Sequence, residues 1–277
     1  MASKLVLTSC VAALAGCSTV SVGHPDVAGS RTAEDVCEFT RDSEPEGLSG
    51  ISRSAENRYF SVDDRGGMLH ELELVLDEEG DVKSCAVKRS VCLEGRGDLE
   101  GCACDPLDGR VWVSDEKDTS IRQFDPKTGK ETARVEVPEV FVKNVRPNRS
   151  FEGLSITPDG YRMYVANEDT LTCDGPAADG TKGGEVRVQE FIRTGKDAKW
   201  IPTRQFRYRT DSVEGSAYKG VALSGVAGLC APGDGTLLVL EREMSQKSPL
   251  FPSFRGRLYE IDLDTDVIEP SKRLLWD

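Results

Sequence analysis

The chain has 277 residues, of which 38% are hydrophobic and 30% charged, so it can bury a sizeable core but has no apolar surplus for a membrane-embedded body. Lysine and arginine number 35 against 48 aspartates and glutamates, which gives a formal net charge of −13. Because this excess repels phosphate backbones, we expect no nucleic-acid partner. The length allows one or two domains, or one large all-β domain.

The N-terminus has the pattern of an export signal. Lys4 precedes an apolar run from Leu5 to Leu14, which is too short to span a bilayer and is followed by small residues. The segment Leu14-Ala15-Gly16-Cys17 resembles a bacterial lipobox, in which the cysteine becomes the lipidated first residue of the mature chain. The alternative is an ordinary signal with a chance cysteine.

These features divide the chain into three parts. We expect a lipoprotein signal peptide over residues 1–16, a lipidated tether over 17–35 that begins at Cys17, and a folded domain over 36–277. Ser18 follows the cysteine, which by the usual sorting rule predicts the outer membrane. The chain is therefore expected to be an exported bacterial lipoprotein that faces the periplasm or the cell surface, held to the membrane by its lipid.

Seven cysteines follow Cys17, so at least one of them stays unpaired. Disulfides are permitted in an exported chain, and Cys85 with Cys92 could bridge a hairpin. Cys102 and Cys104 would share one face of a strand, which suits burial. With no CxxC pair and no histidine partner, they do not predict a zinc site.

An internal repeat organises the rest of the chain. Four windows of sixteen residues, starting at Gly50, Gly101, Gly153 and Gly228, align without a gap. Each crosses a turn and continues with apolar residues two apart, which is the period of a strand. Three of the turns contain Asp-Gly pairs typical of tight hairpins, namely Asp108-Gly109, Asp159-Gly160 and Asp234-Gly235. Each window therefore predicts a β-hairpin.

A further strand follows most hairpins, which makes each unit a small antiparallel sheet. The windows start 51, 52 and 75 residues apart, close to the spacing of four-stranded propeller blades. The long third interval could hold the loop 171–184 or an extra degenerate blade around 204–213. We expect an all-β fold, a β-propeller of about five to six four-stranded blades; the alternative is a β-sandwich, which does not repeat a motif at this period.

Several stretches together resemble the bacterial phytase-like family, which is described as having esterase-like activity of phytase. The loop after Asn167-Glu168, with Leu171 and Asp174-Gly175-Pro176, is also similar to that family. The resemblance runs from about Glu46 to the C-terminus, and it implies a β-propeller that hydrolyses esters. The stretches that carry it are Gly47–Ile51 with Ser61–Arg65, Phe151–Gly160 with Ala166–Glu168, and Gly228–Ala231 with Leu237–Arg242.

One departure from the family pattern concerns the C-terminus. The segment 271–277 resembles one that the family usually follows with another Glu-Gly and Ser-Asp-Asp repeat. The last blade is therefore expected to be missing, which would leave the propeller incomplete and strand edges exposed.

The chain offers little for nucleophilic catalysis by a serine or a histidine. His24 and His70 are its only histidines, His24 lies in the tether, and no Gly-x-Ser-x-Gly elbow occurs. A Ser-His-Asp hydrolase is therefore disfavoured, and we expect His70 on the surface of a strand. A basic cluster of Lys143, Arg146 and Arg149 is either a phosphate-binding group or a solvated loop.

Repeated polar residues at the strand ends are the better candidates. Equivalent positions of different blades meet around a propeller axis, so we expect them to converge at one end of the channel. Oxygen donors without histidine or thiolate suit a hard cation such as Ca²⁺, which can activate a water while a carboxylate serves as general base. The alternative is that these residues cap turns or pair with arginines. The predicted metal ligands are Asp64, Glu100, Asp115, Glu152 and Asn167; the predicted catalytic residues are Glu152, Glu168 and Arg242; and the predicted anion-binding residues are Arg65 and Arg242.

Three functional hypotheses remain. The first is a lipid-anchored envelope hydrolase that acts on small phosphate or carboxylic esters with a divalent cation. The second is a non-catalytic propeller that binds a ligand or a protein, and the third is a sugar-lactonase-like hydrolase that opens cyclic esters. An ester and lactone panel distinguishes them.

Overall fold

The computed structural model describes residues 45–277 except 46, 79, 216–221, 249–250 and 264–271. The predicted signal peptide, the lipidation site at Cys17 and the tether lie outside the described residues. Among the described helices, none is long and apolar enough to cross a membrane.

The described strands form four antiparallel sheets of four strands, each with its strands in sequence order. Blade 1 contains β1 (Leu48–Ala55), β2 (Arg58–Asp63), β3 (Met68–Leu76) and β4 (Val82–Cys92). Blade 2 contains β5 (Leu99–Cys104), β6 (Val111–Asp115), β7 (Ser120–Phe124) and β8 (Glu131–Arg134), and is followed by helix α2 (Glu139–Asn144). Blade 3 contains β9 (Phe151–Ile156), β10 (Arg162–Asn167), β11 (Glu185–Ile192) and β12 (Ile201–Arg209); blade 4 contains β13 (Ala222–Cys230), β14 (Thr236–Ser248), β15 (Phe251–Asp262) and β16 (Arg273–Trp276).

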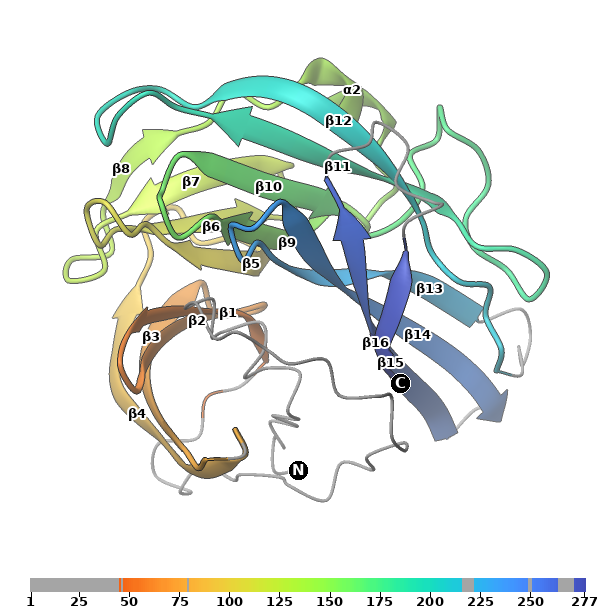
Figure 1. The fold of residues 1–277 in the computed structure, drawn as a ribbon, viewed down its shortest axis with the longest axis horizontal. Coiled ribbons are helices and arrows are strands. Elements are labelled where there is room, and N and C mark those ends of the chain that lie inside the picture. Colours follow the sequence, from red (N-terminus) through yellow and green to blue (C-terminus); the bar gives the residue numbers. More distant parts are fainter. Residues whose placement is uncertain (1–44, 46, 79, 216–221, 249–250, 264–271) are drawn as a thin grey trace.

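The four sheets are the blades of a β-propeller. They follow one another around an arc, with blades 1 and 4 at its ends (Figure 1), and the first strand of each blade packs against the first strand of the next. The part of the chain that the structure describes therefore holds four blades, and the expected count of five to six is not supported. Residues 204–209 belong to β12 of blade 3 and do not begin an extra blade, so the long third interval contains the loop between β10 and β11 instead.

The glycines that open the first three repeat windows explain how closely the inner strands approach. A Cβ atom on Gly50 would lie 2.4 Å from the carbonyl oxygen of Glu100, and one on Gly101 would lie 2.5 Å from that of Glu152. On Gly153 it would lie 2.7 Å from the side chain of Leu229. Any larger residue would push neighbouring inner strands apart, so the repeated glycine is a packing requirement of the axis.

Apolar side chains fill the spaces between successive blades. Val62, Val113 and Val165 from the outgoing hairpin strands are fully buried, as their period of two predicts. In blade 4 the buried pair is Leu237 and Val239, which face blade 3, while Leu238 and Leu240 lie on the opposite, partly exposed face of β14. Because apolar residues follow one another directly in this strand, the sequence alone did not show which alternate set faces the core.

Two expectations about single residues were wrong. His70 is not on the surface but buried, where its Nδ1 lies 2.8 Å from the hydroxyl of Ser90. Cys85 and Cys92 do not bridge a hairpin, because both lie in the single strand β4 and neither forms a disulfide.

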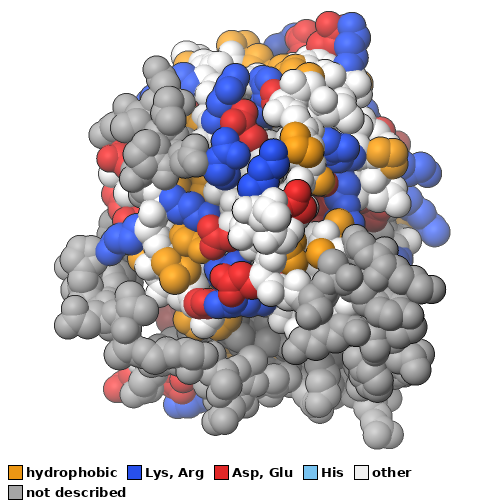
Figure 2. Space-filling model, turned by 90° about the vertical axis from the view of Figure 1, so that its right-hand side faces the viewer, with side chains coloured by type: hydrophobic (Ala, Val, Ile, Leu, Met, Phe, Trp, Pro, Cys, Tyr) orange, Lys and Arg blue, Asp and Glu red, His pale blue; other side chains and the backbone are white. Residues whose placement is uncertain are grey.

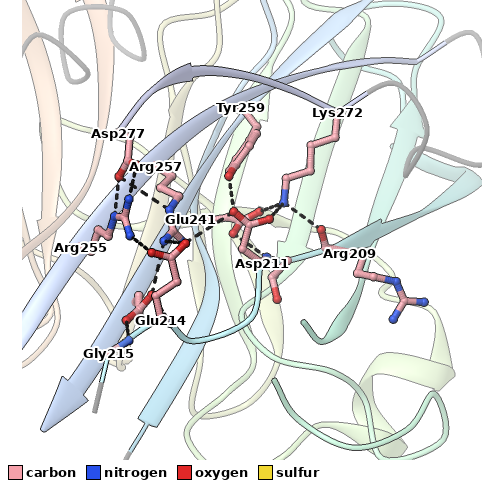
Figure 3. A network of polar contacts seen from close by, with 12 residues as sticks. Arg209, Asp211, Glu214, Gly215, Glu241, Arg255, Arg257, Tyr259, Lys272 and Asp277 are labelled. Carbon is pink, nitrogen blue, oxygen red and sulfur yellow. Dashed lines mark hydrogen bonds and ion pairs between the residues drawn. The ribbon is translucent and has the colours of Figure 1, made fainter. Parts of the chain in front are cut away.

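Buried and half-buried charges fasten blade 4 to blade 3. The ammonium of Lys272, just before β16, donates to Glu241 Oε1 at 2.5 Å, to Asp211 Oδ1 at 2.8 Å and to the carbonyl of Arg209 at 3.1 Å (Figure 3). Arg209 ends β12 of blade 3, whereas Glu241 lies in β14 of blade 4.

On the side of the molecule shown in Figure 2, basic and acidic side chains lie interspersed over the described residues.

A second charged link joins blade 3 to blade 2. The guanidinium of Arg193, which follows β11, makes two hydrogen bonds of 2.7 and 2.6 Å to the carboxylate of Asp105, which follows β5. Trp112 Nε1 donates to the same carboxylate at 3.1 Å, and the guanidinium stacks on the ring of Trp200. Asp105 is fully buried and Arg193 is 5% exposed, so each charge depends on the other.

Replacing Arg193 with alanine is expected to lower the free energy of unfolding by about 3–5 kcal/mol, because it leaves the buried carboxylate of Asp105 without its counter-charge. Urea unfolding followed by tryptophan fluorescence measures the loss. The matched control is Arg134→Ala, which removes an exposed pair with Glu131 and should change stability by less than about 1 kcal/mol. Equal effects of the two variants would contradict the proposed link.

Candidate functional site

Carboxylates from blades 2 and 3 lie close together at one end of these blades. At this end the first strand of each blade begins and its second strand ends. Glu100 and Glu152 are the second residues of β5 and β9, and Glu116 and Glu168 directly follow β6 and β10. Two groups of three carboxylates have oxygen atoms within 4.8 Å of one another: Asp98 with Glu100 and Glu116, and Glu116 with Glu152 and Glu168. Glu116 belongs to both groups, so the cluster is continuous across the two blades.

Ser150 ties this cluster together. Its backbone N–H donates to Glu116 Oε1 at 3.1 Å, and its carbonyl accepts the N–H of Glu168 at 2.7 Å. Its hydroxyl donates to Thr119 Oγ1 at 2.9 Å. Because Ser150 lies two residues before Glu152, one short segment positions all three carboxylates of the second group.

Burial and mutual repulsion disfavour ionisation of the cluster. Burial, and then the nearby carboxylates of Glu116, Asp98 and Asp64, raise the pKa of Glu100 to about 7, although a 2.5 Å hydrogen bond from Ser49 opposes the shift. Glu152 is 7% exposed, and burial followed by the charges of Glu100 and Glu168 raises its pKa well above the ordinary value.

Two further members of the groups follow the same trend. Burial raises the pKa values of Asp98 and Glu116, and neighbouring carboxylates add to the shift. A positive charge bound near these carboxylates would therefore stabilise their ionised forms.

Two arginines supply part of that charge. Arg149 donates to Glu168 Oε1 at 2.6 Å, and Arg242 approaches the same oxygen at 3.3 Å from β14 of blade 4. Arg242 also lies 3.5 Å from Glu152 Oε1. Its side chain is 50% exposed, so it borders both the carboxylates and the solvent.

The structure brings four of the sequence-predicted site residues together: Glu100, Glu152, Glu168 and Arg242. Asp64 lies at the border of the cluster, where its charge contributes to the raised pKa values of Glu100 and Asp98. Arg65 is on the outside, with an 82% exposed side chain whose ion pair is with Asp64, at 3.6 Å.

Asp115 and Asn167 are directed to other partners. Asp115 accepts a 2.5 Å hydrogen bond from Arg122 and further bonds from the backbone N–H groups of Asp98 and Lys117. The amide of Asn167 donates to the carbonyl of Asp169 and accepts the N–H of Arg187. These side chains support loops, and neither belongs to the two carboxylate groups.

Sequence reasoning missed Asp98, Glu116 and Arg149 as site residues. Glu116 stands in the same repeat column as Glu168, a signal that could have identified it. The basic cluster that contains Arg149 does not form one phosphate site, because Lys143 pairs with Glu139 and Arg146 donates to the carbonyls of Thr170 and Gly175. Asp98 lies before its window, and no pattern marked it.

The cluster fits a divalent cation by its donor chemistry. All its candidate ligands are carboxylate oxygens, which hard cations such as Ca²⁺ prefer, and donor atoms within 4.8 Å of one another can share an ion that binds oxygen at roughly 2.3–2.6 Å. Glu152 supports the fit, since its buried carboxylate accepts no hydrogen bond from the described residues and has one ion pair, with Arg242.

Residues 44–274 match the model of the Phytase-like family, described as "Esterase-like activity of phytase". Because the match spans most of the chain, this β-propeller protein belongs to the phytase-like family. No curated protein matches the chain.

Solved structures resemble the chain at low identity. They include Kuenenia stuttgartiensis hydrazine synthase, at 11% identity over 83% of this chain and 64% of that one, with a TM-score of 0.38. A Lactobacillus plantarum protein shares 15% identity over 89% of this chain and 61% of its own, with a TM-score of 0.39. Pseudomonas aeruginosa periplasmic gluconolactonase shares 10% identity over 87% of this chain and 91% of its own, with a TM-score of 0.34. The chain spans less than two thirds of the first two, and similarity at this level does not indicate a shared function.

The raised pKa of Glu100 predicts a pH dependence of stability. The folded chain keeps this proton up to about pH 7, whereas the ordinary glutamate value is 4.5, so the folded state binds more protons between these limits. Without a cation, stability should therefore fall by up to about 3 kcal/mol as the pH rises through this window. The midpoint of thermal unfolding in EDTA, followed from about pH 5 to about pH 8, measures the effect.

Glu100→Gln should remove much of this slope, because the amide has no proton to lose. Glu139→Gln, on the exposed surface of α2, is the matched control and should keep the wild-type slope. A wild-type midpoint that stays constant over the window would contradict the prediction.

Proposed function

We propose that the chain is a hydrolase of small phosphate or carboxylic esters that uses a divalent cation, with Ca²⁺ as the first candidate. The observation that best supports this proposal is that two groups of three carboxylates share Glu116 and lie beside Arg242 and Arg149. Membership of the phytase-like family supports the same reaction class. Asp98, Glu100 and Glu116, which form the first carboxylate group, are the residues proposed to hold the cation.

The proposed reaction uses the chain's own groups in separate roles. A cation bound by these carboxylates would polarise a phosphoryl or carbonyl oxygen and lower the pKa of a water. Once a nearby cation favours its ionised form, the buried Glu152 carboxylate, which has a raised pKa, can accept a proton from the attacking water. Arg242 borders the solvent and can orient the anionic part of a substrate, while Arg149 holds Glu168 in place.

We propose in addition that a lipid anchor holds this hydrolase at the bacterial envelope. The support for this part of the proposal is the lipobox-like segment at Leu14–Cys17 and the serine that follows it. Labelling of cells with a radioactive fatty acid, followed by comparison of the intact chain with Cys17→Ser, tests it. Equal labelling of both would reject the anchor.

A second candidate function is a binding propeller in which the cation is structural. The ion pairs of Glu168 with Arg149 and Arg242 favour it, because such pairs also hold together a cluster without catalytic duty. A panel of phosphate monoesters, carboxylic esters and lactones separates the possibilities. Turnover of lactones alone would assign the lactonase reaction, and no turnover would favour the binder.

Glu152→Gln is expected to lower kcat/KM by about 10²–10⁴, because the amide cannot accept the proton. The fold should be retained, since a neutral group replaces a buried carboxylate whose ionisation is disfavoured. Steady-state turnover of the best ester in the panel measures the loss, with Glu139→Gln as the control. Wild-type turnover in the folded Glu152 variant would remove this residue from the mechanism.

Ca²⁺ should raise the midpoint of thermal unfolding of EDTA-treated protein, because a ligand that binds only the folded state stabilises it by about 2.7 kcal/mol at a hundredfold excess over Kd. Glu116→Gln removes the carboxylate common to both groups and should reduce the shift more than Glu139→Gln does. A wild-type midpoint that is indifferent to Ca²⁺, Mg²⁺ and Mn²⁺ would reject the cation site.

A further inference from the structure

Asp63, His70 and Ser90 lie in a row across the three outer strands of blade 1. Asp63 ends β2, His70 lies in β3, and Ser90 is the residue of β4 directly opposite His70. His70 Nδ1 is 2.8 Å from the hydroxyl oxygen of Ser90, and His70 Nε2 is 3.5 Å from Asp63 Oδ2. A hydroxyl, an imidazole within hydrogen-bond reach of it and a carboxylate beyond the imidazole are the parts of a catalytic triad, which is recognised by geometry and not by sequence order.

The carboxylate of Asp63 is held in place from its other side. Its Oδ1 accepts the backbone N–H groups of Gly66 at 2.7 Å and Met68 at 3.1 Å. A Cβ atom on Gly66 would lie 2.8 Å from Oδ2, so the glycine leaves room for this oxygen beside the turn. Oδ2 is thereby directed to His70, while Oδ1 serves the turn between β2 and β3.

His70 is placed to act as a base toward Ser90. The residue is 6% exposed, and its Nε2 forms no hydrogen bond with any residue that the structure describes, so the Asp63 carboxylate is its nearest acidic partner. An ionised carboxylate can only accept a proton, which selects the tautomer with hydrogen on Nε2 and leaves Nδ1 free to accept the Ser90 proton. Burial lowers the pKa of His70, although Asp63 opposes the shift, and a neutral imidazole is the form that a base requires.

Ser90 is open to a substrate. It is exposed, and β4 is the outermost strand of blade 1 in the part of the chain that the structure describes. Alternate backbone N–H groups along the free edge of such a strand have no ladder partner within the blade and can donate to a developing oxyanion. The half-buried Met68 and the exposed Cys92 are opposite each other two residues further along, on the same face as His70 and Ser90, and offer apolar surface beside the hydroxyl.

The charges near Ser90 favour an uncharged substrate. The two basic residues that precede it in β4 are already paired, Lys88 with Glu73 at 3.3 Å and Arg89 with Glu71 at 3.2 Å. The chain carries a net charge of −13, and a phosphate group would be repelled unless it met a cation. A neutral carboxylic ester needs no such partner.

From this geometry we infer that Ser90 is the nucleophile of a second, cation-independent site for uncharged carboxylic esters, with His70 as its general base and Asp63 as the positioning residue. Ser90 Oγ bonds to the carbonyl carbon while its proton passes to His70 Nδ1; the bond to the alcohol oxygen then breaks, and the alcohol leaves with that proton. A water next attacks the acyl carbon and gives its proton to His70. The bond to Ser90 Oγ breaks, the proton returns to this oxygen, and the carboxylic acid is released.

A fluorophosphonate carrying biotin tests the nucleophile in the full chain with EDTA present, because an activated serine displaces its fluoride and retains the phosphonyl group. Peptide mapping should place the label on Ser90. We expect S90A and H70Q to be labelled more slowly by about 10²-fold, which is the size of a general-base contribution. Ser84→Ala, at an exposed serine of the same strand, is the matched control and should be labelled as wild type is.

S90A decides the test by itself if H70Q fails to fold, since Ser90 is exposed whereas His70 is buried. An absence of label on Ser90 in wild type, or equal labelling of wild type and S90A, would overturn the inference. Turnover of p-nitrophenyl acetate in EDTA is measured in parallel and should be lost in S90A but kept in Glu116→Gln. The reverse pattern, in which EDTA abolishes turnover and S90A behaves as wild type, would overturn the serine site and leave the proposed cation-dependent reaction standing.

Discussion

The close approach of the inner strands at the propeller axis is the constraint on which the site depends. Gly50, Gly101 and Gly153 leave no room for a Cβ atom between neighbouring blades. The residues directly before two of these glycines are Glu100 and Glu152, so the same packing that closes the axis forces two carboxylates into a shared, buried space. Stability and chemistry are therefore coupled here, because the backbone packing that stabilises the blades also creates the electrostatic repulsion within the cluster.

Arginines relieve this repulsion unevenly. Arg149 and Arg242 both contact Glu168, whereas Glu152 has a single, longer ion pair and Glu100 accepts a hydrogen bond from a serine. The cluster thus contains one compensated carboxylate and several that favour protonation or a cation. Such a separation of environments within one set of identical side chains is what allows carboxylates to take different roles in a reaction.

The repeat pattern predicted much of the fold, because each window contains a complete hairpin and its glycine marks the axis. Site residues were predicted correctly only where a position at a strand end is enough to bring the side chain into the cluster, as for Glu152 and Glu168. Asp115 and Asn167 stand in equivalent columns, yet each is directed away by a partner, Arg122 or Asp169, that lies outside the repeat windows. The spacing of the four windows could not show whether the long interval before the fourth window holds a loop or an extra blade.

The charged links between blades also bear on the order in which the molecule opens. Asp105 and Arg193 fasten blade 3 to blade 2, and Lys272 with Glu241 and Asp211 fastens it to blade 4. Blade 3 is thus held from both sides by charged links, which oppose its local opening. We therefore expect slow exchange for the buried amide hydrogens of blade 3, and the same links keep the carboxylates of this blade in register.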